Sequence, residues 1–320
     1  MKRLLISLVI ALGIILACQD PIITSPTPTT TTTAPLPVEH PRVDQPFSWD
    51  IYQGFTAFAL GHPGQDEGNI TGLFAEAMSH GWNTGRICAE LENWDGNAAY
   101  PRKPRDPERL RWTLDIIARI PGAQVLLIGD CTLKGPVPEL EKRAWAERVA
   151  QVAREFQNVA IETHNEFDNC DGRGWGPHCP SKQDVAAHIR IYRQAGIEYV
   201  TADDSLCYGP DVAKTYQFRL ANIGAWPADF HPCRDRAHRP WDPSSSFLAR
   251  VRDFNGEPFV LSETVAWSDS ATDCDGLRTC DLNRINTYIA ACALVPGCKF
   301  TYHSEALLAG ESPTWWPEAQ

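Results

Sequence analysis

The sequence predicts an α/β fold, a single (β/α)8 barrel of the TIM type. From Trp49 onward, short apolar runs alternate with longer segments of helical period, which is typical of βα units around a parallel sheet. We count eight such units, the number that closes this barrel with its helices outside. The first run is not followed by a glycine-rich GxGxxG loop, which disfavours the alternative, an open doubly wound sheet.

The first four units span residues 51–195. The third strand is the run QVLLIGD, and the helix before it carries Leu110, Leu114 and Ile117 on one face. Asp106 followed by Pro107 is typical of a helix start, with a capping carboxylate and a proline at the first helical position. We expect strands at 51–58, 84–89, 124–130 and 159–163, and helices at 70–80, 107–120, 139–156 and 182–195.

The last four units span residues 198–303. The sixth strand is short, around Ala228 to His231. The chain ends in a tail with Trp315 and Trp316, to which the pattern gives no role. We expect strands at 198–202, 228–231, 258–261 and 299–303, and helices at 212–223, 245–254 and 282–294.

The N-terminus predicts export. Lys2 and Arg3 precede an apolar run, 4–17, that is too short to span a bilayer, which is the pattern of a signal peptide. The residues around Cys18 resemble a bacterial lipobox, in which the cysteine is lipidated; an ordinary signal peptide is the alternative. We therefore expect an exported, membrane-anchored lipoprotein that faces the periplasm or the cell exterior.

A linker follows the signal. Residues 18–45 are rich in threonine and proline and hold few large apolar side chains, so they cannot bury enough surface to offset the entropy of ordering. The sequence thus divides into a signal peptide (1–17), a tether (18–45) and a catalytic domain (46–320).

The charge excludes one class of partner. The formal net charge is −11, and no run of lysine and arginine stands out. Because nucleic-acid binding rests on neutralising phosphates, we expect no nucleic-acid partner.

Two glutamates directly follow predicted strands. Glu166 comes after the fourth strand and Glu263 after the seventh. The active sites of (β/α)8 barrels lie at the C-terminal ends of the strands, and strands four and seven lie across the barrel from each other. A glycosidic bond is cleaved by two carboxyl groups, one of which protonates the leaving oxygen while the other attacks the anomeric carbon or activates water.

These segments resemble a known group of enzymes. VAIETHNEFDN is similar to the fourth strand of glycoside hydrolase clan A, and PFVLSETVAW is similar to its seventh. The resemblance implies that Glu166 is the acid/base and Glu263 the nucleophile of a retaining enzyme. It also implies that Arg86 bonds near the nucleophile and that Asn165 contacts the sugar 2-hydroxyl. His231 matches a histidine or polar aromatic position on strand six.

The sequence departs from the clan at strand eight. A tryptophan often ends that strand under the sugar, whereas here it ends in Tyr302 and His303, which we expect to line the substrate site. Tryptophans in the loops after strands can stack on sugars, although packing of long loops is the alternative. The candidates are Trp94, Trp175 and Trp267, the last being four residues past Glu263.

Ten cysteines besides Cys18 suggest disulfides in an exported chain, with some free buried thiols as the alternative. Neighbouring strands and loops favour five hypothetical pairs. These are Cys88–Cys131, Cys170–Cys179, Cys207–Cys233, Cys274–Cys280 and Cys292–Cys298.

No metal or cofactor is expected. The first strand lacks the HxH of zinc-dependent barrel hydrolases, and no CxxC pair is present. The sequence therefore predicts a monomeric retaining O-glycoside hydrolase, an endo-β-glycanase acting on a poly- or oligosaccharide. The alternative is a non-catalytic glycan-binding surface lipoprotein on a degenerate barrel.

Overall fold

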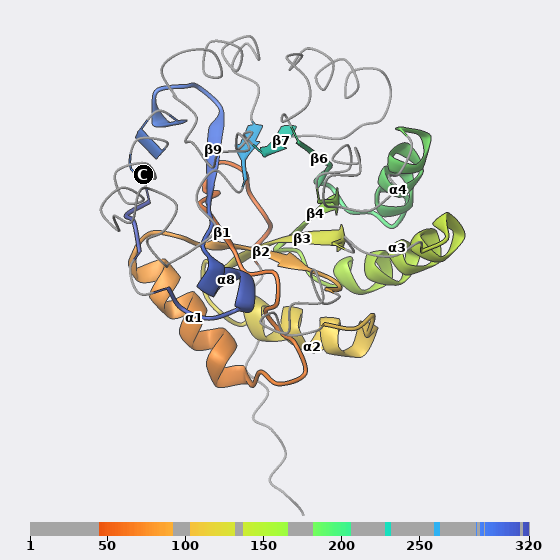
Figure 1. The fold of residues 1–320 in the computed structure, drawn as a ribbon, viewed down its shortest axis with the longest axis horizontal. Helices are drawn as coiled ribbons and strands as arrows, with labels where there is room; N and C mark the ends of the chain where they lie inside the picture. Colours follow the sequence, from red (N-terminus) through yellow and green to blue (C-terminus); the bar gives the residue numbers. More distant parts are fainter. Residues whose placement is uncertain are drawn as a thin grey trace, which may run out of the picture. The chain divides into compact units, whose positions relative to one another are not determined.

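The computed structural model describes ten stretches of the chain, all within the unit His40–Gln320 (Figure 1). They are residues 45–91, 103–131, 137–165, 182–205, 228–231, 259–262, 286, 289–290, 292–313 and 316–319.

A parallel β-sheet forms the centre of this unit. Its strands are β1 (Gly54–Thr56), β2 (Thr84–Cys88), β3 (Gln124–Asp130), β4 (Val159–His164), β5 (Val200–Thr201), β6 (Asp203–Ser205), β7 (Ala228–His231), β8 (Phe259–Leu261) and β9 (Cys298–Tyr302). They follow the order β5-β4-β3-β2-β1-β9-β8-β7-β6, and every pairing is parallel. The two edge strands of that order, β5 and β6, are separated in the chain by Ala202 alone.

Helices follow the first four strands, and a short one follows the last (Figure 1). Asp66 caps the first helix by accepting a hydrogen bond from the backbone N–H of Asn69, and Asp106 caps the second through the N–H groups of Glu108 and Arg109. The helices are α1 (Glu67–Ser79), α2 (Pro107–Ala118), α3 (Glu139–Ala153), α4 (Lys182–Gln194) and α8 (Glu305–Ala309).

The helices cover one face of the sheet with an apolar core. Phe55, Ile87, Leu127 and Ile161 project from four neighbouring strands into this core, where residues of α1 to α4 meet them. Because successive strand residues point to opposite faces, the residues between them lie on the other face. A parallel sheet covered by helices along the chain is an α/β fold.

The opposite face is polar. Gln124, Arg86 and Glu162 are fully buried there, which requires partners for their polar atoms. Gln124 accepts a hydrogen bond from the Ser48 backbone, and the hydroxyls of Tyr52 and Thr301 are 2.8 Å apart. A cluster of Phe47, Trp49 and Tyr52 with Leu126, Ala160 and Val260 of the strands also packs on this face. Arg86 lies two residues beyond Thr84, the partner of Gln124, so the charged side chains lie further toward the carboxyl ends than Gln124 does.

The predicted elements are largely confirmed where the structure describes them. β2, β3, β4, β7, β8 and β9 lie within two residues of their predicted bounds, as does the start of α2. The first strand is three residues long instead of eight, because Ala57 to Leu60 turn away through a backbone hydrogen bond. The fifth strand is divided at Ala202, and α8 was not predicted. The predicted helices 212–223 and 245–254 lie outside the described residues, and 282–294 is described only in part.

Within the described stretches, the helices are all too short or too polar to cross a membrane. The predicted signal peptide, Cys18 and the linker lie outside them.

Candidate active site

Three of the predicted site residues, and Ser262 beside them, lie toward one edge of the sheet. Arg86 is the middle residue of β2, Asn165 directly follows β4, Ser262 follows β8 and His303 follows β9. Because all the strands are parallel, their carboxyl ends lie at the same edge. All four residues are buried. This edge is where α/β proteins with parallel sheets bind their ligands.

Arg86 is the centre of a buried polar network at this edge. Its Nε donates to Glu162 Oε2 at 2.7 Å and its Nη2 to Glu162 Oε1 at 2.6 Å, in the parallel two-bond geometry that guanidinium and carboxylate groups favour. Nη2 also donates to Asn165 Oδ1 at 2.7 Å. Arg86 and Glu162 have no exposed side-chain surface. Each charge is therefore balanced by the other rather than by water.

The face of the guanidinium rests on an aromatic ring. The Arg86 Cζ lies 5.0 Å from the centre of the Phe58 ring, within range of a cation–π contact. Phe58 in turn meets His303 edge-on, with ring centres 6.4 Å apart. Arg86 is thus held along its edge by Glu162 and against its face by Phe58, and His303 belongs to the same contiguous group.

Tyr302 does not lie where the sequence predicted. It pairs in register with Phe55, so its ring points to the helix side of the sheet. There it is fully buried and packs against Trp82 and Trp316. We therefore correct the assignment of Tyr302 as a substrate-lining residue: it is part of the hydrophobic core, and only His303 lies on the polar side.

A pair of buried histidines includes His164, the residue before Asn165. The rings of His164 on β4 and His188 on α4 are 4.6 Å apart, and Asp130 Oδ2 lies 4.0 Å from His164 Nε2 and 3.2 Å from Lys142 Nζ. Burial, reinforced by His188, lowers the pKa of His164 to about 3. Burial also lowers the pKa of His188 despite its 3.0 Å contact with Glu139. Both rings are therefore neutral at pH 7.

Two of the predicted disulfides are present. Cys88–Cys131 joins the ends of β2 and β3 with a Cα–Cα distance of 5.8 Å, and Cys292–Cys298 joins the last predicted helix to β9 at 5.3 Å. The other three predicted pairs, Cys170–Cys179, Cys207–Cys233 and Cys274–Cys280, lie outside the described residues.

Several predicted site residues also lie outside the described part of the chain. Glu166 and Glu263 are the residues that follow Asn165 and Ser262, at which the description stops. The same holds for Trp94, Trp175 and Trp267, and of His231 only the backbone, paired with Ser205, is described. Within the described part, no group of three or more His, Cys, Asp or Glu side chains is arranged to hold a metal ion.

Glu162 was missed in the sequence analysis. Its signal is a charged residue that directly follows the apolar residues Val159 to Ile161 within a predicted strand, where burial demands a partner. That partner, Arg86, is 76 residues away, and spacing alone does not reveal it.

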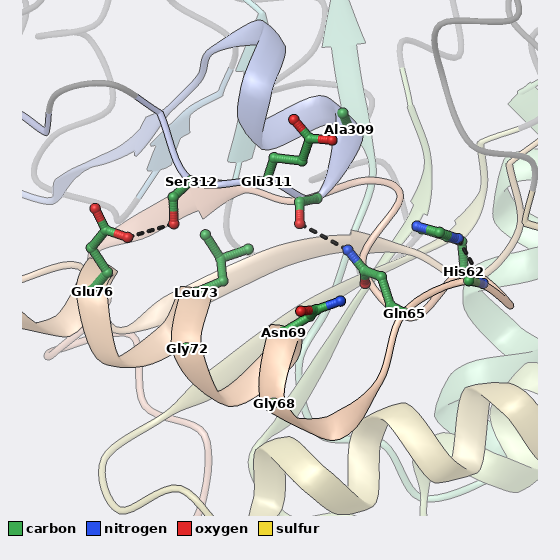
Figure 2. A pocket seen from close by; sticks show the side chains of 12 residues that line it. His62, Gln65, Gly68, Asn69, Gly72, Leu73, Glu76, Ala309, Glu311 and Ser312 are labelled. Atoms are coloured by element: carbon green, nitrogen blue, oxygen red, sulfur yellow. Dashed lines mark hydrogen bonds between the residues drawn. The ribbon is translucent and has the colours of Figure 1, made fainter.

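A separate cavity of about 490 Å³ lies between α1 and the end of α8 (Figure 2). Gly68, Gly72 and Glu76 of α1 form one side, and Glu311 and Ser312 the other. None of the residues that line it is a predicted site residue. The hydrogen bond from Ser312 to Glu76 and the one from Gln65 to the Gly310 carbonyl join its two sides.

Comparisons with known proteins show which fold this is. No protein-family model and no curated protein matches the chain. Among solved structures, the chain is similar to the endo-1,4-beta-mannanase of Rhizomucor miehei, with a TM-score of 0.53, 12% identity and coverage of 83% of this chain and 89% of the mannanase.

Two further solved structures are similar. A Streptomyces cattleya GH5_18 protein in complex with GlcNAc gives a TM-score of 0.53 at 14% identity, over 81% of this chain and 70% of its own. A Bacteroides ovatus GH5 xyloglucanase in complex with an XXXG heptasaccharide gives 0.50 at 12%, over 82% and 72%. At such identities the likeness establishes a shared α/β fold with these glycoside hydrolases.

Proposed function

We propose that this protein is a retaining O-glycoside hydrolase of the clan A type that cleaves β-linked poly- or oligosaccharides from within the chain. One observation carries the proposal: a buried Arg86–Glu162 pair at the carboxyl edge of the sheet binds the side chain of Asn165, the residue before Glu166. A charged network is costly to bury, so its place at the ligand-binding edge of the fold supports a catalytic role.

We propose that the sheet closes into a barrel through β5 and β6. β5 and β6 stand at the two ends of the strand order, yet they follow each other through Ala202. Thr201 pairs with Glu162 of β4, and Asp203 pairs with Asp229 of β7. Because Thr201 and Asp203 are two residues apart, they lie on one face of a continuous strand. Counted as one, these segments give eight strands, the number of a TIM barrel.

Glu166 and Glu263 perform the chemistry. Glu263 attacks the anomeric carbon and forms a glycosyl-enzyme, while Glu166 protonates the leaving oxygen. Glu166 then removes a proton from the water that releases the sugar. Asn165 contacts the 2-hydroxyl, and Arg86 donates hydrogen bonds near the nucleophile. Because Glu162 balances the charge of Arg86, Arg86 acts through its hydrogen bonds more than through net charge.

The substrate class follows the names of the similar structures. A mannanase, a xyloglucanase and a GlcNAc complex share the fold, and each acts on or binds a carbohydrate. We therefore propose a glycan substrate bound across the carboxyl edge of the sheet, lined by His303 and His231. Trp94, Trp175 and Trp267 would stack on further sugar units.

We also propose that the protein is exported from the cytoplasm. The Cys88–Cys131 and Cys292–Cys298 disulfides fit an oxidising compartment. Together with the N-terminal pattern, they support export. We propose a monomeric lipoprotein anchored through Cys18 outside the cytoplasm.

The test is sugar release by the purified protein from a broad panel of β-glucans, mannans, xylans and xyloglucans. We expect the wild type to release sugars from at least one polysaccharide and Glu263→Gln to release none while still binding it. Binding by the wild type without release from any polysaccharide would contradict hydrolysis and favour a glycan-binding surface protein.

A further inference from the structure

Glu162 is placed where it cannot act on a substrate directly. Its side chain is fully buried inside β4, four residues before Glu166. Both carboxylate oxygens accept hydrogen bonds from Arg86. Any effect of Glu162 on a reaction is therefore indirect, and Arg86 is a neighbour that both of its oxygens bind.

The register explains how the two side chains meet across β3. Arg86 pairs with Leu126, which pairs with Ala160, and Glu162 follows Ala160 by two residues on the same face. Ala160 is small, which leaves room on β4 for the long arginine side chain coming from β2. Arg86 can therefore reach Glu162 and Asn165 at once.

The contact between Arg86 and Asn165 fixes the orientation of the Asn165 amide. A guanidinium group has only donors, so the atom that faces Arg86 must be the amide oxygen. The Asn165 NH2 group then points away from Arg86. The backbone of the same residue is held as well, because Asn165 N–H donates to the Asp130 carbonyl at 3.2 Å.

We propose that Glu162 is a positioning residue for glycoside hydrolysis. It locks the Arg86 guanidinium, and the locked guanidinium holds the Asn165 amide with its NH2 group toward the sugar 2-hydroxyl. Asn165 is then a hydrogen-bond donor to that hydroxyl. The inference rests on the proposed function. It adds that Glu162 is needed to orient Asn165, a role separate from the chemistry of Glu166 and Glu263.

The experiment measures how strongly the enzyme depends on the 2-hydroxyl. The probes are an aryl oligoglycoside of the sugar identified on the panel and its 2-deoxy analogue. Comparing the ratio of their kcat/KM values between variants cancels the intrinsic difference in their reactivity. We expect Glu162→Gln to reduce this ratio about tenfold or more, toward the value for Asn165→Ala.

A double-mutant cycle separates positioning from general damage. Because Glu162 acts through Asn165, kcat/KM of Glu162→Gln/Asn165→Ala should lie within about threefold of Asn165→Ala alone. Arg86→Lys, which keeps the charge but not the two-bond geometry, should lose the 2-hydroxyl dependence in the same way. The Arg86→Lys variant also tests the inference if Glu162→Gln fails to fold.

Glu90→Gln is the matched control. Glu90 is a second buried glutamate that accepts hydrogen bonds from an arginine, Arg105, but neither has a described contact with Asn165. Glu90→Gln should leave the ratio of kcat/KM between the glycoside and its 2-deoxy analogue unchanged. A wild type that hydrolyses no glycoside would overturn the proposed function and this inference with it. An active enzyme whose ratio survives both Glu162→Gln and Arg86→Lys would overturn the inference alone.

Discussion

Arg86 and Glu162 form a buried ion pair with two parallel hydrogen bonds of 2.7 and 2.6 Å, although 76 residues separate them in the chain. Neither side chain has exposed surface. A pair of this kind adds little net stability compared with an apolar pair, because both ions lose their hydration. Its presence at the carboxyl edge is therefore better explained by positioning than by stability.

Removing one member of this pair should be costly. Arg86→Met leaves the Glu162 carboxylate buried without its main partner, so we expect the free energy of unfolding to fall by about 3–5 kcal/mol. Urea unfolding followed by circular dichroism measures it. Arg111→Met, which removes the partner of Glu108 and Glu155 at the surface, should leave the midpoint nearly unchanged. Equal effects of the two substitutions would contradict the buried ion pair.

The Cys88–Cys131 disulfide should stabilise the fold strongly. It closes a loop of 43 residues, for which the loss of unfolded-state entropy predicts about 4 kcal/mol. Cys292–Cys298 closes a loop of only six residues, so the same relation predicts about 2 kcal/mol. Thermal unfolding of Cys131→Ser and Cys298→Ser measures both. A larger loss for Cys298→Ser would show that loop closure is not the main source of stability.

Acid should destabilise the protein through the buried histidines. The pKa of His164 is about 3 in the folded state against 6.5 for an ordinary histidine, so the unfolded chain binds the proton first. The contribution of His164 is complete above pH 6.5 and is lost as pH falls from there toward 3. The expected slope is about 1.4 kcal/mol per pH unit for each such histidine.

The measurement is urea unfolding of the wild type and His164→Leu between pH 4 and 8. The lowered pKa of His188 acts in the same direction, so the substitution should make the slope shallower without removing it. Asp130 and Glu139, which face the two rings, favour the protonated forms and limit the slope. Identical slopes for the two proteins would mean that His164 titrates normally in the folded state.

The sequence predicted best those structural features that are determined by residues close together in the chain. The start of α2 was predicted from Asp106 and Pro107 because a helix cap is formed by adjacent residues. The helix α8 was missed, although Ser304 caps it and Gly310 ends it in the left-handed conformation, because a five-residue helix has little periodicity.

The errors at the site come from non-local contacts. Strand residues alternate between faces, but the sequence does not say which of Tyr302 and His303 points inward until the pairing with Phe55 is known. The ion pair of Glu162 likewise involves Arg86, which lies on a strand two positions away in the sheet. The two disulfides were predicted correctly because their cysteines follow neighbouring strands or flank one short turn.

The most direct test of the account is to trap the glycosyl-enzyme. The purified protein is incubated with an activated 2-deoxy-2-fluoro glycoside of the sugar found on the panel, and its peptides are analysed by mass spectrometry. We expect one added glycosyl unit on the peptide that contains Glu263, and none in Glu263→Gln. An adduct on another residue, or turnover of the natural substrate with an inverted product and no adduct, would contradict it.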